Sequence, residues 1–208
     1  PATGLCEPVA LADGTACDSG KVCRSGTCST GCWISNAFHA SGEVNPSNPC
    51  QRCQPSSSTT SWSNLGDGTV CGSNFVCNGG QCPSSCSGDS QCASGYYCGS
   101  EGCTAKKGLG QACTAANQCS SGNCVDGVCC NSTCSGDCNA CNVSGNQGTC
   151  TNLPAGTACA GGFACSGTSG TCPTSCSSES ECVSGYYCSS EGCTAKKDLG
   201  QACTAANQ

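Results

Sequence analysis

Cysteine constrains the fold of this chain more than any other residue. It occupies 31 of 208 positions, about 15%, above the ~8–10% that marks a disulfide scaffold. Leu, Ile, Val and Phe together supply only 19 residues, too few to offset about 1–2 kcal/mol of backbone entropy per ordered residue. Each cross-link lowers the entropy of the unfolded chain, by about 2–4 kcal/mol. We therefore expect disulfides to hold the fold, which places the protein in an oxidising, extracellular or cell-surface environment.

The chain also repeats itself. Residues 86–118 and 176–208 align at an offset of 90 with differences at six of 33 positions, and all five cysteines match. Self-similarity at a fixed period is typical of tandem-repeat proteins. The second copy stops at Gln208 in mid-repeat, so we expect the chain to be part of a longer array.

Two shorter cysteine patterns recur. The signature L-x-x-G-T-x-C occupies residues 11–17, 65–71 and 153–159, and C-x5-C-x4–6-C begins at its cysteine. Its Gly-containing turn before a β-branched residue predicts a short hairpin. A second pattern, C-x5-C-x5-C-x4-C with Gly-Tyr-Tyr before the third cysteine, spans residues 86–103 and 176–193. We call it the Tyr-Tyr module.

One segment replaces a cysteine with an aromatic residue. Trp62 precedes the second signature in the slot that Cys150 fills before the third. An indole at a half-cystine position predicts an apolar contact in place of a bridge. We expect Trp62, Trp33 and Phe38 to form one small core there.

These patterns predict a small disulfide-rich fold: tandem cysteine-knot-like modules with short two-stranded β-hairpins, little regular secondary structure and an elongated, rod-like form. No helical periodicity extends over 11 residues, and we expect at most one helical turn, near residues 114–117. The predicted modules are 1–31 (signature type, partial), 32–85 (Trp/C-x2-C variant plus hairpin), 86–112 (Tyr-Tyr), 113–152 (C-C/C-x2-C), 153–175 (hairpin) and 176–208 (Tyr-Tyr, cut in mid-unit).

Two stretches resemble a known kind of protein. Residues 112–150, ACTAANQCSSGNCVDGVCCNSTCSGDCNACNVSGNQGTC, and residues 41–62, SGEVNPSNPCQRCQPSSSTTSW, resemble cysteine-rich tandem modules of large secreted and surface proteins of myxobacteria and related bacteria. The spacing around Tyr96 and Tyr186 is similar, more loosely, to Dickkopf N-terminal cysteine-rich modules. The resemblance implies an extracellular, disulfide-linked, multi-module protein and no reaction.

Two C-x2-C pairs raise the question of zinc. Zinc requires thiolates, and the other cysteines would have to stay reduced beside it. We therefore expect disulfides, with no metal and no cofactor. The pairs are Cys50/Cys53 and Cys138/Cys141.

For four-cysteine modules, nested hairpins favour bonds from the first cysteine to the third and from the second to the fourth. This guess joins Cys86 to Cys98 and Cys92 to Cys103, and in the second copy Cys176 to Cys188 and Cys182 to Cys193. An odd number of cysteines leaves one over within the chain. Cys203 is the first candidate, either as a bond to another unit or as a free reactive thiol.

Few other residues suggest sites. The pairs Tyr96-Tyr97 and Tyr186-Tyr187 either cover the disulfides or contact a neighbouring module or partner. Asn131 and Asn142 begin N-glycosylation sequons. His39, the one histidine, has no nucleophile suggested near it, and we expect surface exposure or packing on Trp33. Weak calcium binding by scattered carbonyls and carboxylates stays open.

Charge and hydropathy restrict the partners. The net charge is −6 with no basic cluster, which argues against nucleic acid, and no apolar run approaches the ~20 residues of a membrane span. No acid/base or nucleophile constellation can be assembled, so we expect no enzyme. Our main hypothesis is an extracellular structural stalk, fibre or filament that contacts copies of itself or neighbouring repeats. The alternative is an adhesion or ligand-binding array that recognises a glycan or a cell-surface protein.

Overall fold

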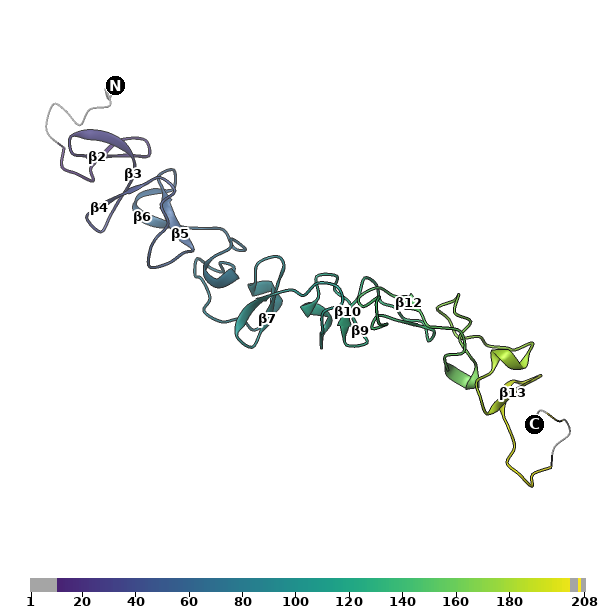
Figure 1. The fold of residues 1–208 in the computed structure, drawn as a ribbon. Coiled ribbons are helices and arrows are strands. Elements are labelled where there is room, and N and C mark those ends of the chain that lie inside the picture. The colour runs from purple at the N-terminus through teal and green to yellow at the C-terminus, as the bar shows by residue number, and fades with distance from the viewer. Residues whose placement is uncertain (1–10, 203–205, 207–208) are drawn as a thin grey trace. The chain divides into compact units, whose positions relative to one another are not determined.

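The computed structural model describes residues 11–202 and residue 206. Among them it contains 14 disulfides, short antiparallel strands and single 3-10 turns. The predicted class, a small disulfide-rich fold with two-stranded hairpins and little other regular structure, is confirmed (Figure 1). No helix in the part of the chain described here is long and apolar enough to cross a membrane.

The chain divides into two units, Pro1–Ala105 and Lys106–Gln208. In the first, a four-stranded antiparallel sheet precedes two separate hairpins. The sheet has the order β1-β2-β3-β4, the hairpins are β5-β6 and β7-β8, and two 3-10 turns lie between them. The bounds are β1 Ala16–Asp18, β2 Lys21–Arg24, β3 Thr27–Ile34, β4 Ala37–Ala40, β5 Gln51–Gln54, β6 Ser58–Asn64, η1 Gly72–Asn74, η2 Asp89–Gln91, β7 Tyr96–Gly99 and β8 Gly102–Ala105.

The second unit contains three hairpins of two to four residues per strand and three 3-10 turns in its described residues. The turn expected near residues 114–117 is present as η3, but the expectation of at most one helical turn is wrong, because the described residues contain five 3-10 turns. The bounds are η3 Ala116–Gln118, β9 Cys124–Val125, β10 Val128–Cys129, β11 Asn139–Ala140, β12 Thr151–Asn152, η4 Ala160–Gly162, η5 Glu179–Glu181, β13 Tyr186–Ser189 and β14 Gly192–Ala195.

The Gly-Thr of each signature holds the middle cysteine of the pattern that follows. In the second copy, Gly68 N donates to Cys77 O at 2.9 Å and Cys77 N donates to Thr69 O at 2.8 Å. The first and third copies make the same two bonds at the same distances. The glycine φ of +85° to +88° in the three copies disfavours residues with a side chain. The signature is therefore a backbone clamp on one cysteine.

The hairpin predicted after each signature is regular in only one copy. After the first signature, β2 and β3 pair with Cys23 opposite Cys28. After the second and third, isolated bridges and a 3-10 turn replace the strands. In those two copies the turn at η1 or η4 contains a residue with positive φ, which interrupts the extended backbone that a strand requires.

Residues 113–129 form a third four-cysteine module, inside the segment 113–152 that the sequence predicts as one module. Cys113 bonds Cys124 and Cys119 bonds Cys129. As in both Tyr-Tyr modules, a 3-10 turn precedes the second cysteine, and the third and fourth face each other across a hairpin. Its C-x5-C-x4-C-x4-C spacing is one residue shorter, and it lacks the tyrosines.

A phenylalanine joins each later signature to the Tyr-Tyr module after it. Phe75 is 5% exposed and forms an isolated antiparallel β-bridge with Cys92. A Cβ on Gly102 would lie 3.2 Å from the Phe75 ring. Phe163, 8% exposed, makes the same bridge to Cys182, and a Cβ on Gly192 would lie 3.1 Å from its ring. We call each arrangement a Phe junction.

Backbone hydrogen bonds reinforce both Phe junctions in the same way. In the first, Val76 N donates to Gln91 O at 3.0 Å and Ala93 N donates to Asn74 O at 2.8 Å. The two equivalent bonds of the second junction measure 2.9 and 3.0 Å. The first signature has Lys21 at the Phe position and no Tyr-Tyr module after it. The phenylalanine is therefore present only where a module docks on it.

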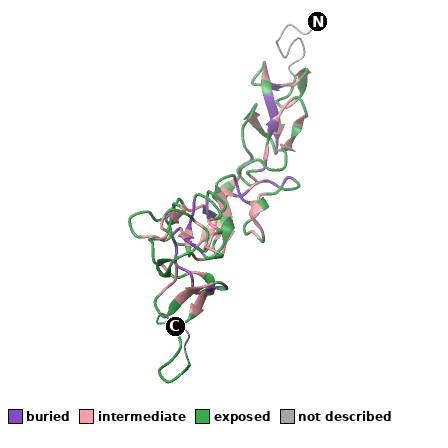
Figure 2. Ribbon diagram, turned by 90° about the vertical axis from the view of Figure 1, so that its right-hand side faces the viewer, coloured by how far each residue is buried: buried purple, intermediate pink, exposed green. Residues whose placement is uncertain are grey.

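The single aromatic core expected from Trp33, Phe38 and Trp62 is wrong. Trp62 packs against the buried cluster of Cys32, Ile34 and Cys53, so the expected apolar contact of Trp62 is confirmed. Trp33 pairs with Phe38 across β3 and β4. Because side chains alternate between the two faces of a strand, Trp33 points away from Cys32 and Ile34, toward Gly14. Buried residues occur as short separate stretches along the ribbon (Figure 2).

Candidate functional site

The structure contains the four disulfides that were predicted for the Tyr-Tyr modules. They are Cys86–Cys98, Cys92–Cys103, Cys176–Cys188 and Cys182–Cys193. Cys203 lies outside the described residues. Covalent pairing leaves these eight sulfurs with a structural role.

The C-x2-C cysteines bond outward to other segments. The bonds are Cys32–Cys53, Cys50–Cys77, Cys130–Cys141 and Cys138–Cys165. Sulfurs of neighbouring disulfides approach within 4.8 Å of one another in several groups, but the cysteines that form these groups are disulfide-bonded. A disulfide sulfur is not the thiolate that zinc requires. The residues present therefore do not fit a zinc centre.

The tyrosines occupy equivalent strand positions in β7 and β13. Tyr96 pairs with Ala105 and Tyr186 with Ala195. The ring of Tyr186 lies directly against Gly162, so it covers the backbone of the η4 turn. Tyr97 and Tyr187 are half-buried. At least one of the four rings thus lies on a contact between modules.

Both sequon asparagines are exposed. The Asn131 side-chain oxygen accepts from Cys150 N at 3.0 Å, and its amide nitrogen makes no hydrogen bond within the described residues. Asn142 Nδ2 donates to Asp126 O at 3.4 Å. Of the two side chains, Asn131 leaves its attachment nitrogen free.

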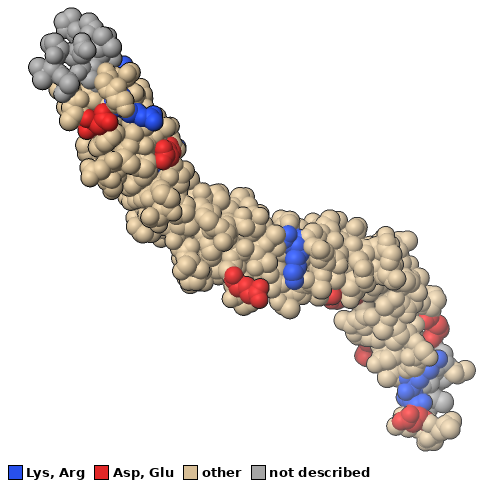
Figure 3. Space-filling model, turned by 60° about the vertical axis from the view of Figure 1, so that its left-hand side comes forward, with Lys and Arg blue, Asp and Glu red and all other residues tan. Residues whose placement is uncertain are grey.

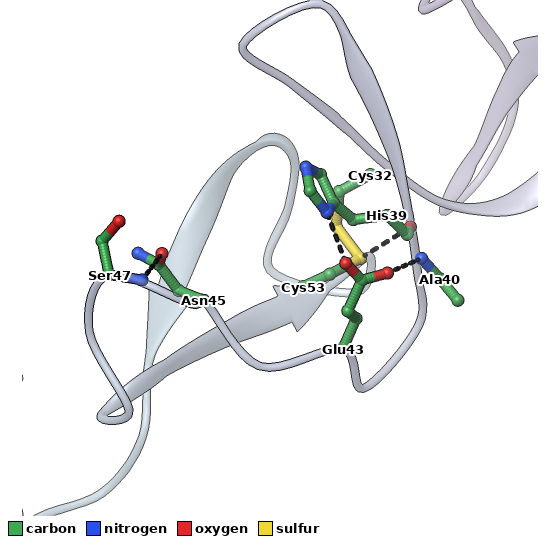
Figure 4. Close-up of polar contacts among 7 residues, drawn as sticks. All are labelled: Cys32, His39, Ala40, Glu43, Asn45, Ser47 and Cys53. Atoms are coloured by element: carbon green, nitrogen blue, oxygen red, sulfur yellow. Dashed lines mark hydrogen bonds and ion pairs between the residues drawn. A yellow bond between two sulfur atoms is a disulfide. The ribbon is translucent and has the colours of Figure 1, made fainter.

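His39 lies on the opposite face of the sheet from Trp33, so the expected packing on Trp33 is wrong. Its ring centroid is 4.5 Å from that of Trp62, and its Nδ1 lies 2.7 Å from Glu43 Oε1. Glu43 Oε2 accepts from Ala40 N at 2.9 Å, beside the Cys32–Cys53 disulfide (Figure 4). The hydrogen bonds from His39 and Ala40 lower the pKa of the Glu43 carboxyl.

A polar cleft of about 500 Å³ opens in the same unit. Three turns and two strands surround it: the β1–β2 turn, β3, the segment after β4, β5 and the β5–β6 turn. Its side-chain donors and acceptors come from Ser19, Thr30, Ser41, Arg52, Gln54 and Ser56. Hydroxyl, amide and guanidinium groups therefore supply the polar part of the cleft lining.

Arg52 is the only charged residue that lines the cleft. Its guanidinium makes no hydrogen bond or ion pair within residues 11–202. The neighbouring acids are engaged elsewhere: Glu43 by His39 and Ala40, and Asp18 by Lys21 at 3.1 Å. A hydrogen bond from Ser19 N and the Lys21 ammonium lower the pKa of the Asp18 carboxyl. Among the described residues, no carboxylate therefore pairs with Arg52.

Sequence reasoning missed both the cleft and Arg52. Its lining residues are small and polar and are spread over residues 19–56, and no motif marks them. An arginine in a chain with seven basic residues is a weak signal, because most arginines lie at the surface. No family model, curated protein or solved structure matches this chain.

Proposed function

We propose that this chain is a non-enzymatic, extracellular structural spacer, built from tandem disulfide modules of the kind it resembles in bacterial surface proteins. The observation that carries the proposal is the Phe junction. It occurs twice, with the same bridge, the same close glycine and the same pair of backbone bonds. A linear assembly of repeats requires the same junction geometry between each pair of neighbouring modules.

Covalent closure supports the same function. Every disulfide with a partner in residues 106–195 closes within that stretch, which is one 90-residue period of the sequence repeat. Copies of this stretch can therefore be added without leaving a cysteine unpaired. The surface is also poor in charge: Figure 3 shows a few blue and red groups on a largely uncharged face. Small polar side chains suit a spacer exposed to solvent.

The test adds repeats and measures length. One or two further copies of residues 106–195 are inserted between Ala195 and Lys196, and oxidised particles are imaged by electron microscopy. A spacer should lengthen by the same increment with each copy at constant width, and reduction of the disulfides should abolish the regular length. Particles that instead grow in all dimensions would contradict the proposal.

The polar cleft favours a second function, ligand binding by the same scaffold. The hydroxyl-bearing residues of its lining and Arg52, which has no partner among the described residues, are not needed by the disulfide framework. In this case the spacer would present a binding site on its first unit.

A further inference from the structure

We propose that the polar cleft around Arg52 binds an acidic saccharide, with the guanidinium of Arg52 paired to a uronic carboxylate. Arg presents planar N–H donors that match a carboxylate with two parallel hydrogen bonds. The side chain is exposed and unpaired within the described residues. The protein therefore supplies the cation, and the ligand must supply the anion.

The remaining lining groups fit an oxygen-rich ligand. Ser19, Thr30, Ser41 and Ser56 carry hydroxyl groups, which both donate and accept, and Gln54 carries an amide. Sugar hydroxyl groups have the same dual character. The cleft volume of about 500 Å³ is within the range of about 300–1,000 Å³ found for small-molecule sites.

Because no aromatic residue lines the cleft, the charge of Arg52 determines its affinity and selectivity for a ligand. No Trp, Tyr or Phe lines the cleft, so stacking on an apolar sugar face cannot supply affinity. Hydrogen bonds to an open surface compete with water and contribute little net affinity each. A neutral sugar would therefore bind poorly, and a charge-assisted bond would carry the selectivity.

The charge of this part of the chain suits an anionic ligand. Residues 11–64 contain three acids and three Lys or Arg residues, including both arginines of the chain, whereas residues 65–208 contain nine acids and four lysines. Repulsion of an acidic polymer is therefore weakest near the cleft. Arg24, the other arginine, lies 4.6 Å from the Phe38 ring centroid and does not line the cleft.

The backbone of two glycines also lines the cleft. Gly20 and Gly42 line the cleft with φ of +69° and +87°. A Cβ on Gly20 would lie 3.5 Å from Pro55, so the two turns approach each other there. Their amides provide local probes of occupancy.

The test is an NMR titration of the full oxidised chain with trigalacturonic acid. Saturable shifts at the amides of Gly20, Gly42 and Gln54 are expected at roughly millimolar ligand. Arg52→Gln should weaken binding about tenfold or more, because the amide keeps donors but loses the charge. Arg24→Gln is the matched control and should bind as the unmodified chain does.

Two comparison ligands separate the alternatives. Neutral maltotriose and an acetylated tripeptide with a free terminal carboxylate should each bind much more weakly than trigalacturonic acid. If maltotriose bound equally well, the charge of Arg52 would have no role and the proposal would be wrong. If the tripeptide bound more tightly, the cleft would be a site for a peptide C-terminus and not for an acidic saccharide. Absence of saturable shifts at these amides, or equal loss in the Arg24 and Arg52 variants, would overturn the site. None of these outcomes depends on the spacer function.

Discussion

Reduction should lengthen the stretched chain by about 370 Å between Cys17 and Cys193, because disulfides bypass most of the backbone. Under tension, force follows the shortest covalent path. That path crosses eight disulfides, from Cys17–Cys28 to Cys176–Cys188, with Cα–Cα distances of 5.5 to 5.9 Å. The segments between those bonds are all that can extend.

The lengths follow from the pairing. The path contains roughly 56 residue steps, against roughly 176 in the reduced chain, at about 3.5 Å per step when extended. With the disulfide crossings, the oxidised segment reaches about 240 Å and the reduced one about 620 Å. Pairing each cysteine with its nearest neighbour in sequence would release only about 180 Å.

The assay is single-molecule force spectroscopy with the handles attached next to the two cysteines that bound the calculation, at Ala16 and Thr194. The contour length is measured in oxidising buffer and again after a thiol reductant enters the cell. A gain near 370 Å would match the pairing described above, since alternative pairings bypass different lengths. A gain near 180 Å would refute the described connectivity, and no gain would refute disulfide closure itself.

Three further outcomes are expected from single substitutions. Gly102→Ala should destabilise the first Phe junction, because the added Cβ lies against the Phe75 ring and the backbone φ of +109° disfavours a side chain; hydrogen exchange of the junction amides should rise. Asp67→Ala should cost about 1 kcal/mol in denaturant unfolding of the oxidised chain, since its carboxylate accepts from Gly79 N at 2.8 Å. Glu43→Gln should flatten the acid dependence of stability. The lowered pKa of Glu43 contributes stability that is present above its unfolded pKa and lost as pH falls through the folded pKa, between about pH 5 and about pH 3.

Each substitution has a control in the same chain. Gly88→Ala meets no atom within 4 Å and should leave hydrogen exchange unchanged. Ala155 already stands at the Asp67 position in the third signature, so Ala155→Asp should stabilise that copy. Ser41→Ala, two residues from Glu43, removes no carboxylate and should leave the acid dependence as it is. Equal effects of a substitution and its control would contradict the contact assigned.

Local spacing predicted the parts of the fold that local geometry determines. The 1–3, 2–4 pairing of a Tyr-Tyr module follows from one turn and one hairpin within 18 residues. The partner of Cys77 does not, because Cys50 lies 27 residues away in a different segment. Many pairings are compatible with cysteine spacing alone.

The aromatic residues show a second limit. The sequence predicts Trp33 and Trp62 as core residues alike, but whether they meet depends on the face of β3 from which Trp33 projects. Because β3 is continuous over eight residues, its alternation sends Ile34 and Trp33 to opposite sides. The cleft around Arg52 escaped prediction for a related reason: three turns distant in sequence form it.

The short span of the disulfides also sets the order in which this chain can oxidise. No bond among the described pairs joins cysteines more than 27 residues apart. A chain that crosses a membrane from its N-terminus can thus complete each bond soon after its second cysteine emerges. Yet the second cysteine of a four-cysteine module emerges before the third, so a non-native bond between the first two can form before the native one. In a chain that oxidises as it emerges, maturation would then depend on thiol–disulfide exchange that keeps pace with emergence.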